Sequence, residues 1–376
     1  MKRRWYVRRY KPGEEQKISS AMKIVYGHGL HKEVWKWFYS ENPFKHHFGV
    51  ADYENQIVGF MGLAGKPLVL EGKQFKACIA SELGVHPNFR RQGVFTTLGQ
   101  YIMNEAAKQG IDLCYGFPNE IARLGHMKYG WFDVCPNVPI YVKYLTANGL
   151  FKSRKVRKIL SRLKIPSYTA NNSLTRLFIE YCLLKMIARY CKLKFQLPDH
   201  SGPISKLTFI RRFNNAFDDF WKKAWMPHKI AIKRDSKYLN WRYFQKPLGK
   251  YVVLIAERDE EVIGFICLLI ADVKGQKVGY IADFLTLPDE ETTLNTLLDE
   301  GIRYCKRQKV DAIGCWLLGN NRYLRVLKRN AFFKAASGMR LMARINREEM
   351  EKYRPILENA SNWYITLGDA DFDLSI

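Results

Sequence analysis

The pattern of hydrophobic and polar residues in the first third of the chain predicts a group of antiparallel strands. Two apolar runs within residues 47–65 flank the polar stretch from Asp52 to Asn55, which predicts two strands joined by a turn. A third strand is predicted over residues 73–87. Pro87 ends it, because proline has no N–H to donate to the hydrogen-bond ladder of a sheet.

Helical spacing begins after this third strand. Apolar residues recur there every three or four positions and a glycine follows as a stop signal: Phe95, Leu98, Ile102 and Ala106, then Gly110. Residues 111–119 are typical of a buried strand, and residues 120–131 predict a short helix that ends at Gly130. The predicted order is antiparallel strands, then strand, helix, strand and helix.

A second copy of this pattern follows later in the chain. Three residues match at one constant spacing: Trp37, Tyr39 and Pro43 with Trp241, Tyr243 and Pro247. Gly59-Phe60 also matches Gly264-Phe265, and the segment from Asn119 parallels the one from Asn320. Matches in the same order predict an α/β protein with two copies of one domain, each a mixed, mostly antiparallel sheet flanked by helices. We expect domains at 1–145 and 206–345, a basic helical linker at 146–205 and a tail at 346–376.

The net charge of +25 is concentrated in the predicted linker. Between residues 145 and 197, twelve Lys or Arg face the single acid Glu180. We favour a solvated helical linker. The alternative is a basic amphipathic surface on an anionic membrane, with an apolar side made of Leu150, Phe151, Val156, Ile159, Leu160 and Leu163. Nucleic acid ranks third, since no recognised nucleic-acid module surrounds the charge.

Cysteine spacing and hydropathy bear on compartment and metal binding. The eight cysteines form no Cys-x-x-Cys pair and no Cys/His cluster, so neither a disulfide framework nor a metal site is predicted. No apolar run follows the charged N-terminal residues, and no segment reaches the length of a membrane span. We therefore expect a cytoplasmic protein with reduced thiols, with membrane association through the linker as the alternative.

The loop before the predicted helix at Phe95 is the candidate anion site. A strand runs into Arg90-Arg91-Gln92-Gly93-Val94-Phe95, where the first N–H groups of the helix have no backbone partner. Gly93 allows close backbone approach, and the two arginines supply charge that pairs with phosphate. The loop is predicted to hold a pyrophosphate.

The same residues resemble the coenzyme A pyrophosphate loop of the GNAT N-acyltransferases. That loop has Arg or Gln, two residues, Gly, one residue, then Gly or Ala; here the positions are Arg90, Gly93 and Phe95, so phenylalanine replaces the last small residue. Asn119, Ala122 and Gly130-Trp131 resemble the second motif of the family. The second copy lacks the arginine-glycine loop and resembles the degenerate half of a tandem GNAT protein. The segments YLNWRYFQKP and NWYITLGDADFD are similar to tandem proteins of bacterial surface polysaccharide synthesis.

The resemblance implies acetyl-CoA or another acyl-CoA as co-substrate and an amine as acceptor. It implies that the backbone of Leu83 and Val85 serves the thioester, with Glu82 as the base; the alternative for Glu82 is a structural acid beside basic residues. The implied coenzyme-binding set is Leu83, Val85, Arg90, Arg91, Gln92, Gly93, Val94, Phe95, Thr96 and Asn119.

The general acid is the least defined part of the implied site. Where the family usually has a tyrosine that protonates the leaving thiolate, this chain has His126, and Tyr129 is a substitute nearby. A packing role for the histidine is the alternative. Cys114 and Cys135 are interpreted as buried structural cysteines.

The second copy is expected to bind no coenzyme and to shape the acceptor cleft. Trp241, Arg242, Tyr243 and Asp283 are candidates there, although a core position for the two aromatic residues is favoured. The leading acceptor is an amino sugar or a related cell-envelope precursor. Two alternatives stay open: an aminoacyl transferase of the same tandem fold that uses charged tRNA, and a non-catalytic acyl-CoA-binding scaffold or sensor.

Overall fold

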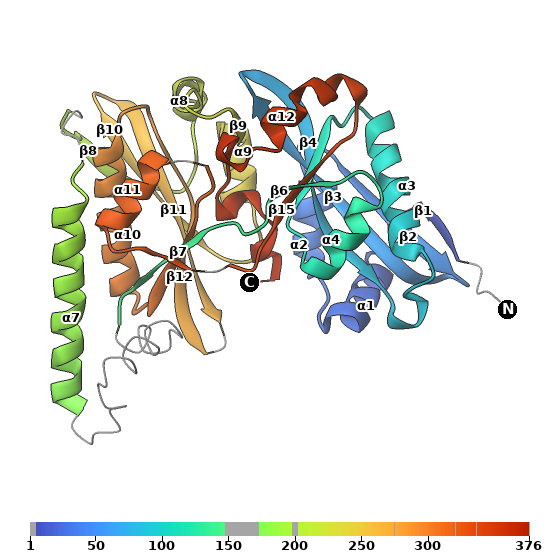
Figure 1. The fold of residues 1–376 in the computed structure, drawn as a ribbon, viewed down its shortest axis with the longest axis horizontal. Helices are drawn as coiled ribbons and strands as arrows, with labels where there is room; N and C mark the ends of the chain where they lie inside the picture. Colours follow the sequence, from blue (N-terminus) through green and yellow to red (C-terminus); the bar gives the residue numbers. More distant parts are fainter. Residues whose placement is uncertain are drawn as a thin grey trace. The chain divides into compact units, whose positions relative to one another are not determined.

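The computed structural model describes residues 5–146, 173–197, 202–273, 275–319, 321–335 and 337–375. It divides into two compact units, each assembled from segments that are distant in the sequence (Figure 1). Unit 1 comprises Met1–Val138, Trp225–Leu248 and Ser337–Ile376, and unit 2 comprises Pro139–Ala224 and Gly249–Ala336. Each unit is built around one sheet.

The sheet of unit 1 has the strand order β1-β2-β3-β4-β5-β15-β6, with β9 pairing to β3 and β16 to β9. Its strands are β1 Tyr6–Arg9, β2 His46–Tyr53, β3 Gln56–Leu70, β4 Lys73–Val85, β5 Leu113–Gly116, β6 Phe132–Cys135, β9 Ile230–Ile232, β15 Leu341–Ile345 and β16 Trp363–Tyr364. The β4–β5 and β9–β16 pairs are parallel and the other pairs are antiparallel. A mixed, mostly antiparallel sheet was predicted, and this is confirmed.

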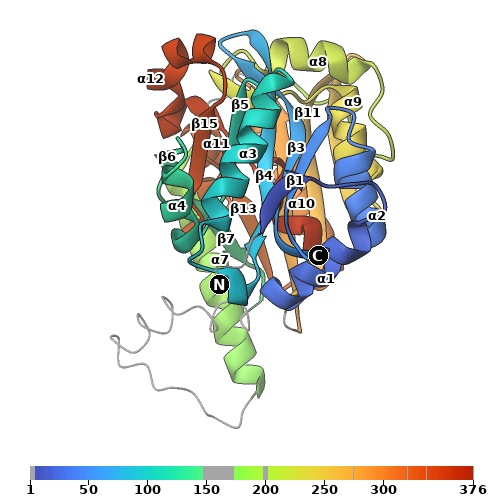
Figure 2. The ribbon, with the colours of Figure 1, turned by 90° about the vertical axis from the view of Figure 1, so that its right-hand side faces the viewer.

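Helix α3 covers one face of this sheet (Figure 2). The inward residues Leu98, Ile102, Met103 and Ala106 are buried in the core with Met61 and Leu63 of β3. The helical elements of unit 1 are α1 Glu15–Tyr26, α2 Lys32–Trp35, the π-helix η1 Lys36–Ser40, η2 Pro87–Phe89, α3 Val94–Lys108, α4 Glu120–Met127, α9 Ser236–Leu239, the π-helix η3 Asn240–Phe244, η4 Glu348–Tyr353, α12 Arg354–Leu357, η5 Ala360–Asn362, η6 Leu367–Asp369 and η7 Phe372–Ser375.

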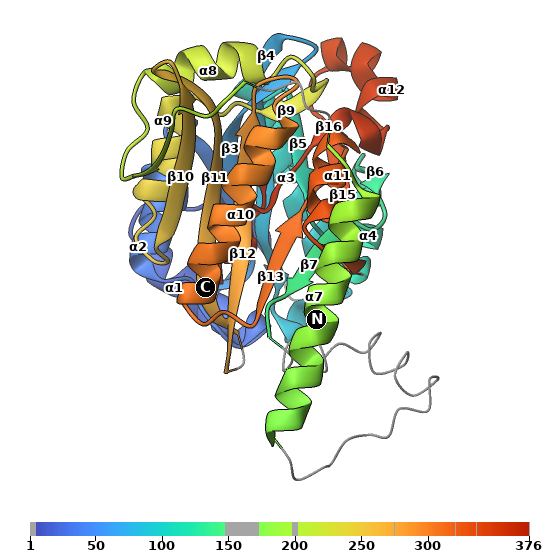
Figure 3. The ribbon, with the colours of Figure 1, turned by 90° about the vertical axis from the view of Figure 1, so that its left-hand side faces the viewer.

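The sheet of unit 2 has the order β14-β7-β13-β12-β11-β10-β8. Its strands are β7 Ile140–Tyr144, β8 Lys206–Ile210, β10 Tyr251–Arg258, β11 Glu261–Val273, β12 Gln276–Thr286, β13 Ala312–Trp316 and β14 Phe333–Ala335. Its helices are α7 Ser173–Lys194, α8 Ala216–Ala224, α10 Glu291–Arg307 and α11 Asn321–Arg329. Figure 3 shows α10 along this sheet, where it packs on β11 and β12 as α3 packs on β2 and β3 in unit 1.

The two repeats exchange one strand each. β7 follows the first repeat in the sequence, yet it pairs with β13 and β14 in the sheet of unit 2. β15 follows the second repeat and lies between β5 and β6 in unit 1. The units therefore differ from the contiguous division expected at 1–145, 146–205 and 206–345, and residues 346–376 are part of unit 1 instead of a separate tail.

Unit 1 also contains the segment Trp225–Leu248, which belongs to the second repeat. Trp37 and Trp241, matched in the sequence comparison, stack with ring centroids 5.2 Å apart. Each indole N–H donates to the backbone carbonyl of the other residue, at 2.7 and 3.2 Å. This reciprocal pairing is what two copies of one segment produce when they pack together.

No helix in the described part of the chain is long and apolar enough to cross a membrane. Within the same residues there is no group of three or more His, Cys, Asp or Glu that could hold a metal ion. The predicted amphipathic side of the linker, Leu150, Phe151, Val156, Ile159, Leu160 and Leu163, lies outside the described residues.

Candidate active site

A β-bulge in β4 carries the candidate base Glu82. Gly62 of β3 pairs with Ser81, and Phe60 pairs with Gly84. Glu82 and Leu83 therefore both lie opposite one residue of β3, Met61. Glu82 adopts a φ of 52°, in the left-handed region that non-glycine residues rarely occupy. Bulges of this kind change the direction of side chains and end the regular pairing of a strand.

Strands β4 and β5 part at the bulge. Their parallel pairing runs from Ala77–Leu113 to Ala80–Gly116 and stops there. His86 N–H still donates to Val58 of β3 at 2.8 Å, whereas the Val85 carbonyl accepts from Arg90 Nε at 3.3 Å. Because neighbouring residues of a strand direct their backbone groups to opposite edges, Val85 and Leu83 both face the edge where the β5 ladder has ended. This edge has backbone groups available for a ligand.

The surroundings of Glu82 favour its neutral form. Burial, followed by the negative charge of Asp371, raises the pKa of Glu82 to about 7. Glu82 and Asp371 also act on Tyr39, whose pKa lies well above its ordinary value, chiefly because of burial. Tyr39 shares a hydrogen bond of 2.8 Å with Ser81, the residue before Glu82. A carboxyl that titrates near neutral pH suits a base that must accept a proton under physiological conditions.

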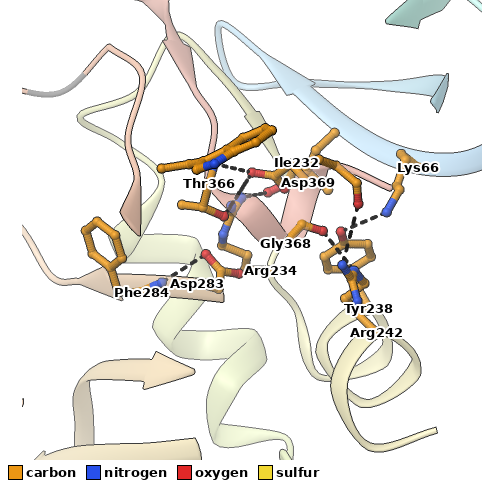
Figure 4. A network of polar contacts seen from close by, with 12 residues as sticks. Lys66, Ile232, Arg234, Tyr238, Arg242, Asp283, Phe284, Thr366, Gly368 and Asp369 are labelled. Carbon is orange, nitrogen blue, oxygen red and sulfur yellow. Dashed lines mark hydrogen bonds and ion pairs between the residues drawn. The ribbon is translucent and has the colours of Figure 1, made fainter. Parts of the chain in front are cut away.

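Asp371 belongs to a C-terminal segment that two fully buried arginines hold in place (Figure 4). Arg234 Nη2 contacts Asp369 Oδ2 at 2.7 Å, and Arg242 Nε donates to the Gly368 carbonyl at 2.8 Å. Tyr115 of β5 donates its hydroxyl to the Asp369 carbonyl at 2.8 Å. Asp371 was not among the predicted site residues, because nothing in a linear pattern places the C-terminus beside a strand near residue 82.

The predicted pyrophosphate loop presents an open helix N-terminus. Gly93, with a φ of 84°, is the N-cap of α3, and no side chain caps the helix there. Arg91 also has a positive φ of 61°, and Arg90, Arg91 and Gln92 are exposed. Since the first N–H groups of a helix have no partner within it, the backbone from Val94 to Thr96 has donors for an anion.

Phe95, the departure from the family pattern, packs sideways onto α4. Its ring lies where a side chain on Gly125 would be, since a Cβ there would come within 2.3 Å of Phe95 Cε1. The ring also meets His126 edge-on, with centroids 5.4 Å apart. The phenylalanine therefore fills the space between α3 and α4, and Gly125 makes that space.

The other motif residues have structural contacts. Asn119 is the N-cap of α4, and its Oδ1 accepts from Ala122 N–H at 2.9 Å. His126 and Tyr129 are buried and share a hydrogen bond between Nδ1 and the hydroxyl. Burial lowers the pKa of His126 to about 4 and raises that of Tyr129 well above its usual value. Both residues are thus neutral at pH 7 and pack in the core with Trp131. These contacts do not test a general-acid role, which stays a prediction.

The second unit has carboxylates where the first has arginines. α10 begins after Glu290, and Glu291 occupies its first turn. Glu290 pairs with Arg258 at 2.6 Å and accepts a hydrogen bond from Thr293. Acidic side chains already complement the positive end of this helix and would repel a phosphate.

The remaining candidate residues are all buried. Trp241, Arg242 and Tyr243 lie in η3 of unit 1, with exposed fractions of 1%, 1% and 2%. Asp283 lies in β12 of unit 2 and accepts from Phe284 N–H at 3.0 Å. Cys114 and Cys135 are free and buried. The core position favoured for the two aromatic residues agrees with this burial.

Two family models match the chain in tandem. Residues 6–132 match the model described as Acetyltransferase (GNAT) domain, and residues 210–329 match the model described as Acetyltransferase (GNAT) family. The matches coincide with the two repeats and confirm them. No curated protein is similar enough in sequence to count as a relative.

Several solved structures share the fold at low sequence identity. A protein from Enterococcus faecalis V583, described as a conserved protein of unknown function and probable N-acyltransferase, has a TM-score of 0.59 and 12% identity over 93% of this chain and 74% of its own. A GCN5-related N-acetyltransferase from Anabaena variabilis has a TM-score of 0.59 and 14% identity over 92% and 73%. The N-myristoyltransferase of Saccharomyces cerevisiae, solved with bound myristoyl-CoA, has a TM-score of 0.55 and 13% identity over 92% and 79%.

Proposed function

Because the chain carries two domains of the GNAT acetyltransferase family, we propose that it is an N-acyltransferase in which unit 1 binds acyl-CoA and acylates an amine. One observation carries the proposal. Glu82, with a pKa raised to about 7, lies on the bulge where β4 parts from β5, and the open N-terminus of α3 follows the same strand. A base, free backbone donors and an anion site thus follow one another within residues 82–96.

Each part of this arrangement has a role in acyl transfer. Arg90, Arg91 and the N-terminus of α3 bind the pyrophosphate of the coenzyme, with Gly93 letting it approach the backbone. The N–H groups of Leu83 and Val85 stabilise the negative charge that develops on the thioester oxygen. The amine nitrogen forms a bond to the thioester carbonyl carbon, and Glu82 accepts the proton that the amine loses. The carbon–sulfur bond then breaks, and the departing thiolate takes up a proton from water.

The acceptor and the acyl group are finer proposals. We keep an amino sugar or a related cell-envelope precursor as the acceptor, on the resemblance of YLNWRYFQKP and NWYITLGDADFD alone. For the acyl group, the yeast N-myristoyltransferase is bound to myristoyl-CoA, so a screen should run from acetyl-CoA to long-chain acyl-CoA. A panel of amines tested with each donor would separate the two questions.

Calorimetric titration with acetyl-CoA tests the proposed coenzyme site. We expect one site per chain, because the helix α10 of unit 2 begins with acids. Arg90→Ala/Arg91→Ala should weaken binding by roughly tenfold to a hundredfold, since each charged hydrogen bond contributes about 1.5–3 kcal/mol and exposed partners contribute less. The matched control is Arg303→Ala/Arg307→Ala, two exposed arginines of α10. No binding by the folded wild type, or equal loss in the control, would reject this site.

One observation favours the non-catalytic alternative. His126 and Tyr129, the only general acids predicted, are occupied with each other and with the core. A scaffold or sensor would bind acyl-CoA and release no free thiol with any amine, including under conditions where Glu82 is ionised. For the tRNA-dependent alternative, RNA that copurifies and is lost on nuclease treatment would be the corresponding sign.

A further inference from the structure

Helix α7 of unit 2 exposes a row of apolar side chains. Met186, Tyr190 and Leu193 are 62%, 59% and 67% exposed. Spacings of four and three residues place them on one face of the helix. Three large apolar side chains in a row on one helix face differ from the single exposed apolar residues that are normal on a protein surface.

The opposite face of α7 is already packed. Cys191 is 2% exposed, and the end of the helix is fastened to α11. Arg329 Nη1 of α11 donates to the carbonyls of Lys192 and Phe195, both at 3.1 Å. Figure 3 shows α7 lying beside α11. The apolar row is therefore a second face, separate from the one that holds the helix to its unit.

Basic residues border this row. Lys185, Arg189, Lys192 and Lys194 are exposed, and residues 182–197 contain no acid. Lys194 Nζ lies 3.1 Å from the Tyr190 hydroxyl and 5.4 Å from the centre of its ring. In the sequence, residues 147–172 before the helix add seven Lys or Arg and no acid. This face of α7 thus combines exposed apolar side chains with basic side chains, and within residues 182–197 it has no acidic side chain to offset their charge.

We propose that this face of α7, defined by Met186, Tyr190 and Leu193 with Lys185, Arg189, Lys192 and Lys194, docks on an anionic membrane surface. A helix that lies in the membrane interface inserts its apolar side chains among the acyl chains while lysines and arginines meet the anionic headgroups. RNA would satisfy the charge, but it offers Met186 and Leu193 no apolar environment. The basic residues are complementary to anionic headgroups and the apolar row is complementary to acyl chains, so the combination favours a lipid surface over RNA.

Vesicle flotation of the full chain tests the proposal. The vesicles contain phosphatidylcholine alone or phosphatidylcholine with phosphatidylglycerol. We expect wild type to float with the anionic vesicles, less so at high salt, and to stay in solution with the neutral ones. The same behaviour toward both vesicle types, or no flotation at all, would overturn the proposal.

Two triple variants separate charge from apolar insertion. Lys185→Gln/Arg189→Gln/Lys192→Gln should weaken partitioning roughly a hundredfold, because each basic residue near an anionic surface contributes about a factor of five. Met186→Ser/Tyr190→Ser/Leu193→Ser should weaken it at least about tenfold at every salt concentration. Acetyl-CoA binding and far-ultraviolet circular dichroism check that both variants are folded.

The matched control removes three exposed lysines from unit 1: Lys17→Gln/Lys23→Gln/Lys32→Gln. It should float like wild type. An equal loss in this control would show that net charge, and not the face of α7, drives binding. If wild type binds RNA through the three basic residues of α7 and ignores anionic vesicles, the face is an RNA surface and the proposal fails.

Discussion

Glu82 is the residue at which stability and activity oppose each other. Its folded-state pKa of about 7 exceeds the ordinary value of 4.5, so the folded protein binds this proton more tightly than the unfolded chain does. Stability therefore falls as the pH rises from about 4.5 to about 7. Ionised Glu82, the form needed in a base, is the form that destabilises the fold.

Glu82→Gln should raise the free energy of unfolding above pH 7 by about 3 kcal/mol, at the usual 1.4 kcal/mol per pKa unit, and change it little below pH 4.5. Chemical denaturation at both pH values measures this. The exposed Glu71→Gln serves as control and should stay within about 0.5 kcal/mol of wild type. A destabilised Glu82→Gln at high pH would refute the assignment of an unfavourable buried charge.

Asp371→Asn should shift the acid limb of the rate–pH profile to lower pH. The charge of Asp371 raises the pKa of Glu82, so its removal lets the base ionise earlier. Initial rates with the preferred amine, measured from pH 5 to 9, give the limb. As a control, Glu349→Gln removes an exposed acid from the same C-terminal part of the chain and should leave the acid limb of the profile unshifted. An unmoved limb in Asp371→Asn would mean that the two carboxyls do not interact.

At the scale of elements, the contact between Phe95 of α3 and Gly125 of α4 holds the first turn of α3, which follows the coenzyme loop, against its neighbouring helix. Gly125→Ala places a Cβ 2.3 Å from Phe95 Cε1 and should destabilise the protein by about 1–3 kcal/mol. It should also weaken acetyl-CoA binding, because Phe95 lies in the first turn of α3. Thermal unfolding and calorimetry report the two effects.

A second substitution and a control test the cause of this effect. Phe95→Ala in the same chain should relieve the clash, so the double variant should lose less stability than the two single changes add up to. Gly301→Ala in α10 meets its nearest atom only at 3.3 Å and should cost less than Gly125→Ala. Strict additivity of the two changes would show that the ring and the glycine are not coupled.

At the scale of the whole molecule, the exchange of β7 and β15 makes each sheet depend on both repeats. Residues 1–138 alone lack β15, so β5 and β6 would lose the strand that lies between them. We expect this fragment to be insoluble or to unfold without cooperativity. Fragments 1–172 and 173–376, produced together, should copurify through a tag on one of them, because each carries a strand of the other's sheet.

The tagged fragment produced alone is the control for that experiment, and it should fail to give a folded species. Cooperative unfolding and acetyl-CoA binding by residues 1–138 alone would show that the exchanged strand is dispensable.

Local patterns predicted the elements because their causes are local. Helical spacing from Phe95 to Ala106 corresponds to α3, and the turn between Asp52 and Asn55 joins β2 to β3. The Arg90–Gly93 loop was found for the same reason, since a strand, a glycine and a helix start are contiguous in the chain. The role of Phe95 was not predictable, because the space for its ring is made by Gly125 on another helix.

The sequence by itself determined the two repeats, the order of strands and helices from β2 to α4, and the positions of Glu82 and the arginine-glycine loop. Only the tertiary structure decided which sheet receives β7 and β15 and which acid lies near Glu82. Strand pairing of this kind depends on contacts between residues about 170 to 230 positions apart, as in Ala312–Tyr144 and Ala343–Tyr115. The same holds for Asp371, because Arg234, Arg242 and Tyr115 position its segment from other parts of the chain. A linear pattern reports local propensity and periodicity. Long-range contacts depend instead on which segments bury apolar surface and satisfy hydrogen bonds together in the folded protein.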